Sequence, residues 1–276
     1  MLIDFHVHYF PKPIFKAIWK YFETHTNGLW KINYKFSRQE ISNALNENGV
    51  KRFTTLVYAH KAGIAMDLNR YICEESGKNS SMIPFGTIYA GDGNVEETAK
   101  KIFEDWKFSG IKLHPFVSKE NLDDERFFPV YEMMEDKGKV LVCHPGSGPV
   151  YTQFDGANRL RTVLERFPRL KTVIAHCGAF EYGDYNKICD DFENVYFDTA
   201  MNCVHTIVFE HNCPGKEFFI KYQDRILFGS DFPNIPYDYV EQSKGINKFQ
   251  LGSEIENKIK FLNAAKLLGI EKDFLS

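Results

Sequence analysis

The chain has 276 residues, of which 43% are hydrophobic and 15% aromatic, and its formal net charge is −3 at pH 7. This length and apolar content suffice for one large core, and α/β barrels often use this length for a single domain, so we predict one domain over residues 1–276. The weak net charge, without a basic run or a membrane-length apolar run, disfavours nucleic acid and membrane as partners and favours a small-molecule substrate.

Eight short apolar segments rich in β-branched and aromatic residues have the character of β-strands. They lie at about residues 2–6, 53–58, 83–88, 110–114, 139–144, 171–176, 194–198 and 225–230. Segments with helical periodicity lie between them, for example 94–106, 125–137 and 157–167. The chain therefore alternates between strand and helix over its whole length.

Two of the predicted helices begin at a capping box, in which Ser and a Glu three residues later bind each other's backbone N–H groups. Ser37–Glu40 opens a helix that ends before Gly49, and Ser253–Glu256 opens a terminal helix that ends at Gly269. Glycine after the last periodic residue is a common helix stop.

Near-continuous apolar strands, such as those at 139–144 and 171–176, are typical of a parallel sheet covered by helices. Eight strand and helix units predict a (β/α)8 TIM barrel. An open, doubly wound sheet is disfavoured because no Gly-rich phosphate loop follows the first strand. We predict irregular loops at 25–36 and 232–251, with residues 27–30 as the candidate lid.

Polar side chains follow several of the predicted strands. The first strand ends in DFHVH, and residues two apart in a strand point to the same side, so His6 and His8 can bind one metal ion. His144 ends the fifth strand, His176 the sixth and Asp231 the eighth. Any one of these residues could instead cap a turn. Active sites of barrels form at these strand ends, however, and such residues at the ends of four strands favour a shared site.

Several motifs occur in the order found in a known superfamily. They are DFHVH, GIKLHP, CHPGSG, AHCGAF, NVYFDT and FGSDFP, followed by FLNAAKLLGI as a closing helix. The sequence thus resembles the amidohydrolase superfamily, in particular the amidohydrolase-related branch that includes aminocarboxymuconate-semialdehyde decarboxylase. The resemblance implies a metal ion held by His6, His8, His144 and Asp231, with His176 beside the metal-bound water.

The chemistry of these residues agrees with that assignment. Three imidazoles and a carboxylate suit one divalent ion, most simply Zn²⁺, although Mn²⁺, Fe²⁺ or Co²⁺ fit the same donors. Zinc can lower the pKa of bound water from about 15.7 to about 7. Asp231 can accept the proton of that water, and His176 can orient the nucleophile or stabilise charge on the substrate. Asp4 is expected either to orient a ligand imidazole or to support the first strand.

Further strand ends supply candidate substrate contacts. Lys112 and His114 share one face of the fourth strand, and some superfamily members carry a carboxylated lysine there that bridges two metals. We favour a single metal ion and keep the bridging carbamate as the alternative. The other candidates are Tyr58, His60, Tyr89 and Asp198; the aromatic ones could instead plug the barrel.

Hydrolysis of a small amide, lactone or ester by metal-activated water is the first functional hypothesis. The alternative is metal-dependent, non-oxidative decarboxylation of an aromatic or unsaturated carboxylic acid. Arg159 and Arg161 lie in a predicted helix as solvated charges, which leaves no clear grip for a substrate carboxylate and favours hydrolysis. A non-catalytic metal-binding barrel is disfavoured, because His176 beside a reserved water position does not suit a closed structural site.

The six cysteines, at positions 73, 143, 177, 189, 203 and 213, include no CxxC pair. With no leader-like segment at the start, this pattern predicts a cytoplasmic protein with reduced cysteines in its core. Cys143 and Cys177 are expected to pack behind the strands, because neighbours in a strand point to opposite faces. Formation of a homodimer stays open.

Overall fold

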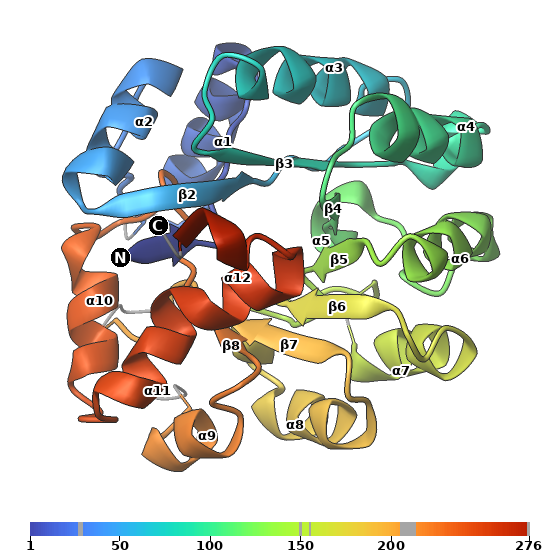
Figure 1. The fold of residues 1–276 in the computed structure, drawn as a ribbon. Helices are drawn as coiled ribbons and strands as arrows, with labels where there is room; N and C mark the ends of the chain where they lie inside the picture. Colours follow the sequence, from blue (N-terminus) through green and yellow to red (C-terminus); the bar gives the residue numbers. More distant parts are fainter. Residues whose placement is uncertain (27–29, 149–150, 155, 205–213, 275–276) are drawn as a thin grey trace. The chain divides into compact units, whose positions relative to one another are not determined.

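The computed structural model describes residues 1–26, 30–148, 151–154, 156–204 and 214–274. Its strands follow one another in the order β1 to β8 in one eight-stranded sheet, which confirms the predicted (β/α)8 barrel (Figure 1). The chain clusters into two compact units, Met1–Thr55 with Asp198–Ser276, and Leu56–Phe197. The prediction of a single domain over the whole chain stays a prediction.

The unit Leu56–Phe197 contains the central run of parallel strands. These are β3 (Met82–Gly86), β4 (Gly110–Leu113), β5 (Val140–Cys143), β6 (Lys171–Ile174) and β7 (Val195–Asp198), whose last residue belongs to the other unit. Each strand pairs in parallel with the next, and Lys112, Val142, Val173 and Tyr196 lie in one row of the register. The rows place the carboxyl ends of these strands at a common edge.

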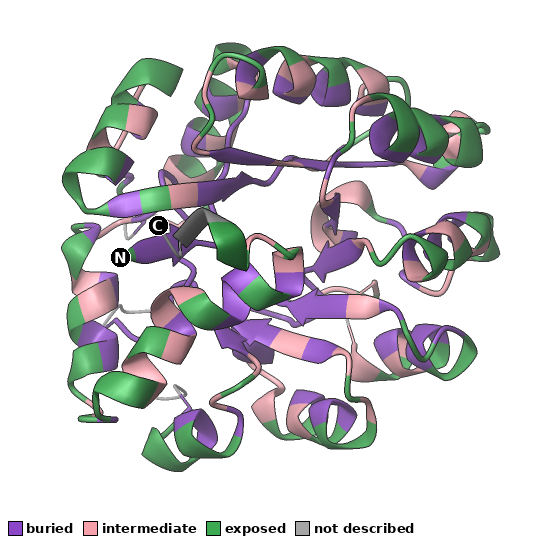
Figure 2. Ribbon diagram, viewed as in Figure 1, coloured by how far each residue is buried: buried purple, intermediate pink, exposed green. Residues whose placement is uncertain are grey.

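Helices alternate with the strands of this unit, as predicted. They are α3 (Ala65–Ser76), α4 (Val95–Lys100), α5 (Pro115–Ser118), α6 (Phe128–Asp136), α7 (Ala157–Arg166) and α8 (Tyr182–Asp191). Figure 2 shows strands that are largely buried and helices with one buried and one exposed side. This pattern is the one expected for a parallel sheet covered by amphipathic helices.

The other unit combines both ends of the chain. It contains β1 (Leu2–Asp4), α1 (Lys12–His25), α2 (Arg38–Glu47), β2 (Val50–Thr55), α9 (Lys216–Lys221), β8 (Ile226–Leu227), α10 (Val240–Asn247), α11 (Ser253–Asn257) and α12 (Asn263–Leu268). β1 pairs in parallel with β2. Beyond Asp4, the backbone runs beside the segment after β8, since Phe5 N donates to Phe228 O at 2.8 Å and His8 N to Phe232 O at 2.8 Å.

The structure confirms one capping box and corrects the other. The Ser37 hydroxyl accepts from Glu40 N at 3.4 Å, and Glu40 Oε2 accepts from Ser37 N at 2.7 Å. Ser253 is already the first residue of α11 and Gly252 is its N-cap, so the second box is wrong: a side chain inside the helix does not cap it. Gly269 ends α12 with a φ of 67°, as predicted.

The predicted loop over 232–251 is also partly wrong, because it contains α10. This helix is stabilised by burial rather than by its own sequence pattern. Gly245 of α10 packs against the backbone of Cys203, where an added Cβ would lie 1.6 Å from the Cys203 carbonyl oxygen.

Within the predicted loop over 25–36, most of the candidate lid lies outside the described residues. Its last member, Trp30, is buried, and its indole N–H donates to Asn234 O at 3.1 Å.

Four of the five described cysteines are buried, including Cys143 and Cys177, and Cys73 is half-buried; Cys213 lies outside the described residues. Their burial agrees with the prediction that the cysteines lie in the core, and their reduced state stays a prediction. Among the described residues, no helix combines the length and apolar character needed to cross a membrane.

One prediction tests the packing of the parallel strands. A Cβ added at Gly110 of β4 would lie 2.0 Å from the Val140 carbonyl oxygen of β5. We expect Gly110→Ala to lower the free energy of unfolding by ~3 kcal/mol, because the paired backbones of β4 and β5 must move apart to make room for the methyl group. Gly183→Ala in α8, where an added Cβ meets nothing within 4 Å, is the matched control and should leave stability unchanged or slightly raised. Equilibrium unfolding in urea measures both, and equal stabilities would contradict the packing argument.

Candidate metal centre

The extension of β1 brings two imidazoles and a carboxylate together. Val7, between the two histidines, forms a parallel bridge with Phe232, and Asp231 N donates to His6 O at 2.9 Å. The Nε2 atoms of His6 and His8 lie 3.2 and 3.1 Å from Asp231 Oδ1. Strand alternation places both imidazoles on the same side, as predicted, and the turn after β8 brings Asp231 to them.

These three residues fit a divalent metal ion. All three are buried, and one donor atom from each lies within 4.8 Å of the other two. Donors about 2.1 Å from one ion lie about 3.0–3.4 Å apart at angles near 90–110°, which matches the two measured separations. Two imidazoles and a carboxylate suit Zn²⁺, Mn²⁺, Fe²⁺ and Co²⁺ alike. In the part of the chain that the structure describes, this is the only such group of three or more His, Cys, Asp and Glu side chains.

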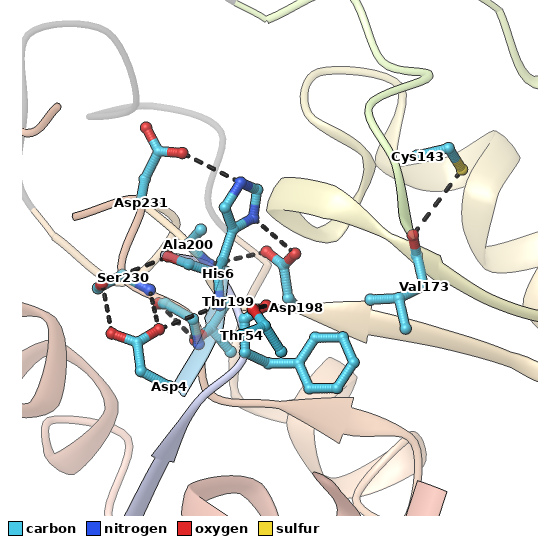
Figure 3. A network of polar contacts seen from close by, with 12 residues as sticks. Asp4, His6, Thr54, Cys143, Val173, Asp198, Thr199, Ala200, Ser230 and Asp231 are labelled. Atoms are coloured by element: carbon cyan, nitrogen blue, oxygen red, sulfur yellow. Dashed lines mark hydrogen bonds and ion pairs between the residues drawn. The ribbon is translucent and has the colours of Figure 1, made fainter. Parts of the chain in front are cut away.

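Asp198, the last residue of β7, lies behind the His6 ring. His6 Nδ1 is 2.8 Å from Asp198 Oδ2 (Figure 3). Both side chains are fully buried. When Nδ1 carries the proton and donates to the carboxylate, Nε2 keeps its lone pair for a metal ion. The Asp198 carboxylate thus contacts the imidazole of a candidate ligand, and its predicted contact with a substrate stays a prediction.

Asp4 joins the two segments that carry the ligands. Its Oδ1 accepts from His6 N and Ser230 N, both at 3.1 Å, and its Oδ2 accepts from Ser230 Oγ at 2.5 Å (Figure 3). Asp4 Oδ2 also accepts from Tyr239 OH at 2.7 Å. Burial raises the pKa of Asp4 to about 7, although these hydrogen bonds act in the opposite direction. Asp231 has a left-handed φ of 69°, which is uncommon for a non-glycine residue. Asp4 thus supports the backbone on both sides of the candidate metal-binding group.

A second group of imidazoles lies in the unit Leu56–Phe197. The His114 ring stacks on the His144 ring with centroids 4.3 Å apart, and the His176 ring meets His144 edge-on at 4.7 Å. Tyr58 meets His114 edge-on at 4.9 Å. The three strand-end histidines of this unit therefore form one cluster. The prediction that His144 binds the same metal ion as His6, His8 and Asp231 stays a prediction.

Comparison with known proteins identifies the family. A family model for amidohydrolases matches residues 3–270. The chain belongs to the amidohydrolase family. This confirms the resemblance seen in the sequence, and the chain is an enzyme of the amidohydrolase superfamily.

Solved structures share the fold of this amidohydrolase over nearly its whole length. An uncharacterised TIM-barrel protein from Bordetella bronchiseptica is 19% identical, with 98% of this chain and 99% of that chain covered and a TM-score of 0.76. A 5-carboxyvanillate decarboxylase from Novosphingobium aromaticivorans, in complex with manganese and 4-hydroxy-3-methoxy-5-nitrobenzoic acid, is 14% identical (98% and 96% covered, TM-score 0.69). A 4-oxalomesaconate hydratase from Rhodopseudomonas palustris is 18% identical (100% and 98% covered, TM-score 0.64).

The remaining predicted substrate contacts of this amidohydrolase differ in exposure. Lys112 is fully buried in β4, Tyr58 and Tyr89 are half-buried, and His60 is exposed. Partial burial lowers the pKa of His60, and burial together with Glu120 raises the pKa of Tyr89. Contact of these residues with a substrate stays a prediction, as does the choice between a free and a carboxylated Lys112.

The two arginines that could have gripped a substrate carboxylate have protein partners. Arg159 binds the carboxylate of Asp123 at 3.0 Å, and Arg161 binds that of Asp191 at 2.7 Å. All four side chains are at least a quarter exposed. This agrees with their prediction as solvated charges.

The role inferred for Asp198 leads to a testable expectation. Asp198→Asn keeps the shape of the side chain but removes the charge that holds the His6 Nδ1 proton, so metal affinity should fall by about 10–100-fold. Asp191→Asn in α8, an exposed carboxylate, is the control and should keep wild-type affinity. Competition with a chromogenic chelator measures both, and equal affinities for the two variants would refute the role of Asp198.

Proposed function

We propose that this amidohydrolase is a metal-dependent decarboxylase that acts on a small aromatic or unsaturated carboxylic acid. The observation that carries the proposal is the buried group of His6, His8 and Asp231, which fits a divalent ion. Support for the reaction class comes from proteins of the same fold that are named as decarboxylases, one of them in complex with manganese. The proposal replaces hydrolysis as the first hypothesis.

Each residue of the proposed site has a definite task. A divalent ion, when bound, supplies positive charge that attracts an anionic substrate and stabilises negative charge as CO₂ leaves. His6 and His8 contribute imidazole nitrogens, Asp231 contributes a carboxylate oxygen, and His144 is the proposed fourth ligand. His176 holds a proton on its ring and delivers it to the carbon that loses CO₂. The C–C bond breaks, its electron pair stays on that carbon, and the proton replaces the carboxylate.

Hydrolysis of a small amide, lactone or ester is the second candidate. Support for it comes from the family itself, whose members are described as amidohydrolases. The same metal-binding residues serve both reactions, so the residues of the site alone do not separate them. The two reactions are distinguished by which solvent atoms, hydrogen or oxygen, enter the product.

The test uses protein loaded with Mn²⁺ or Zn²⁺ and two panels of compounds. Hydroxybenzoic and unsaturated dicarboxylic acids form one panel, and amides, lactones and esters form the other. We expect CO₂ release from a member of the first panel, with one solvent deuteron on the product carbon in D₂O and no oxygen from H₂¹⁸O. A product that gains solvent oxygen without loss of CO₂ would overturn the proposal and promote hydrolysis. Chelation of the metal should abolish turnover in either case.

A further inference from the structure

In the unit Leu56–Phe197, one loop comes directly after His144 and another shortly after His176, and the backbones of these two loops are in close contact. The loop after β5 contains residues 145–148, and the loop after β6 contains residues 178–181. Gly148 N donates to Ala179 O at 2.9 Å. A Cβ at Gly146 would lie 2.2 Å from the same Ala179 oxygen, so the close approach requires glycine.

One side chain reinforces this contact. Glu181 Oε2 accepts from Ser147 N at 3.0 Å, and Glu181 Oε1 accepts from the Ser147 hydroxyl. Ser147 is buried, with 8% of its surface exposed. Hydrogen bonds to an ionised carboxylate are about twice as strong as neutral ones, and two of them restrict rotation of the pair. A second anchor comes from Tyr185, whose hydroxyl donates to Pro145 O at 2.6 Å.

The backbone that these contacts hold is unusual. His176 and Cys177 have left-handed φ values of 55° and 51°. Non-glycine residues adopt this region rarely, and they keep it where the surrounding structure leaves no other choice. The His144 and His176 rings are 4.7 Å apart with an interplanar angle of 67°. Their relative orientation therefore depends on how firmly the two loops are joined.

We propose that Glu181 is a positioning residue that holds the imidazoles of His144 and His176 in this orientation through Ser147. The assignment of tasks to the two imidazoles rests on the proposed function, whereas their orientation does not. Glu181 lies outside the strand-end pattern, because it is five residues past His176 and acts on the preceding loop.

The test follows the two rings directly. The Zn²⁺-loaded protein is labelled with ¹³C-histidine, and the ring Cε1–Hε1 signals of His144 and His176 are assigned with His144→Asn and His176→Asn. We expect Glu181→Ala to shift both signals while the signal of His25, exposed on α1, stays in place. Zn²⁺ affinity should fall by about 10-fold, the low end for loss of a group that orients a ligand. A role in stability alone would lower the melting temperature without moving the signals.

Matched variants give the proposal its controls. Glu181→Gln keeps an acceptor for Ser147 N, so both signals should stay at their wild-type positions. Ser147→Ala removes only the hydrogen bond of the Ser147 hydroxyl, so the shifts should be smaller than in Glu181→Ala. Glu165→Ala, at an exposed position on α7, should change neither signal. Unshifted signals in folded Glu181→Ala, or equal shifts in Glu165→Ala, would overturn the proposal. If Glu181→Ala does not fold, unshifted signals in Ser147→Ala overturn it instead. Absence of decarboxylation would remove the proposed function but leave this readout intact.

Discussion

Replacement of His6 by alanine is expected to remove the bound metal and the activity together. His6 Nε2 lies 3.2 Å from Asp231 Oδ1, and its other ring nitrogen is 2.8 Å from Asp198 Oδ2, so both nitrogens are placed for a ligand that a carboxylate orients. A divalent site that loses one of its few protein ligands binds far more weakly. We expect the metal content after dialysis to fall from about one ion per chain to below about 0.1, with turnover at background. Metal analysis by mass spectrometry and an assay of the same sample measure both quantities.

His8→Ala provides an independent version of this experiment. His6→Ala also leaves the buried Asp198 carboxylate without its imidazole, which lowers stability as well as metal affinity. His8 Nε2 lies 3.1 Å from Asp231 Oδ1, and the His6–Asp198 contact stays in place in His8→Ala, so this variant should lose the metal with a smaller effect on folding. His25→Ala, in an exposed position on α1, is the control and should keep both metal and activity. Stoichiometric metal in both His6→Ala and His8→Ala would refute the site.

The second large effect is expected for His176→Ala. This variant should keep most of its metal but lose turnover by about 10²–10⁴-fold, the usual contribution of a positioned proton donor. The reason is that His176 is assigned to proton delivery rather than to metal binding. The ring centroids of His176 and His144 are 4.7 Å apart, so His176 lies close to a proposed ligand. Metal content and turnover number are measured on the same preparation.

His144→Ala is the matched comparison, because it removes the neighbouring imidazole of the same cluster. We expect it to lose metal and turnover together. Equal metal loss in His176→Ala and His144→Ala would make His176 a ligand and would refute its separate role. Full metal retention in His144→Ala would instead remove His144 from the ligand set.

Decarboxylation requires a positive charge that binds the substrate carboxylate, whereas hydrolysis of an amide, lactone or ester does not. The sequence favoured hydrolysis because it showed no arginine clearly placed to bind a substrate carboxylate. In the structure, Arg159 forms an ion pair with Asp123, and Arg161 forms one with Asp191. That argument loses force if the charge that attracts the carboxylate is the divalent ion itself. The panel of acids tests this directly, since chelation should then weaken substrate binding as well as turnover.

Some features of this amidohydrolase follow from local sequence alone. The pairing of His6 with His8 follows from the two-residue period of a strand, and Asp231 follows from its place directly after an apolar strand. The number and order of strands follow from alternating apolar and helical segments, whose signals are also local. The capping box at Ser37–Glu40 is confirmed for the same reason, because both partners lie within one turn.

Other features depended on contacts between segments far apart in the chain. Asp198 lies 192 residues from the His6 imidazole it binds, and Asp4 lies 226 residues from Ser230, so no local pattern reveals either partner. Glu181 acts on a loop 34 residues earlier. Helix α10 forms in a predicted loop because its buried side packs against distant residues, which outweighs its weak local pattern. The sequence by itself thus determined which residues can bind a metal ion, and the tertiary structure decided which residues orient them, because orientation depends on partners that only folding brings together.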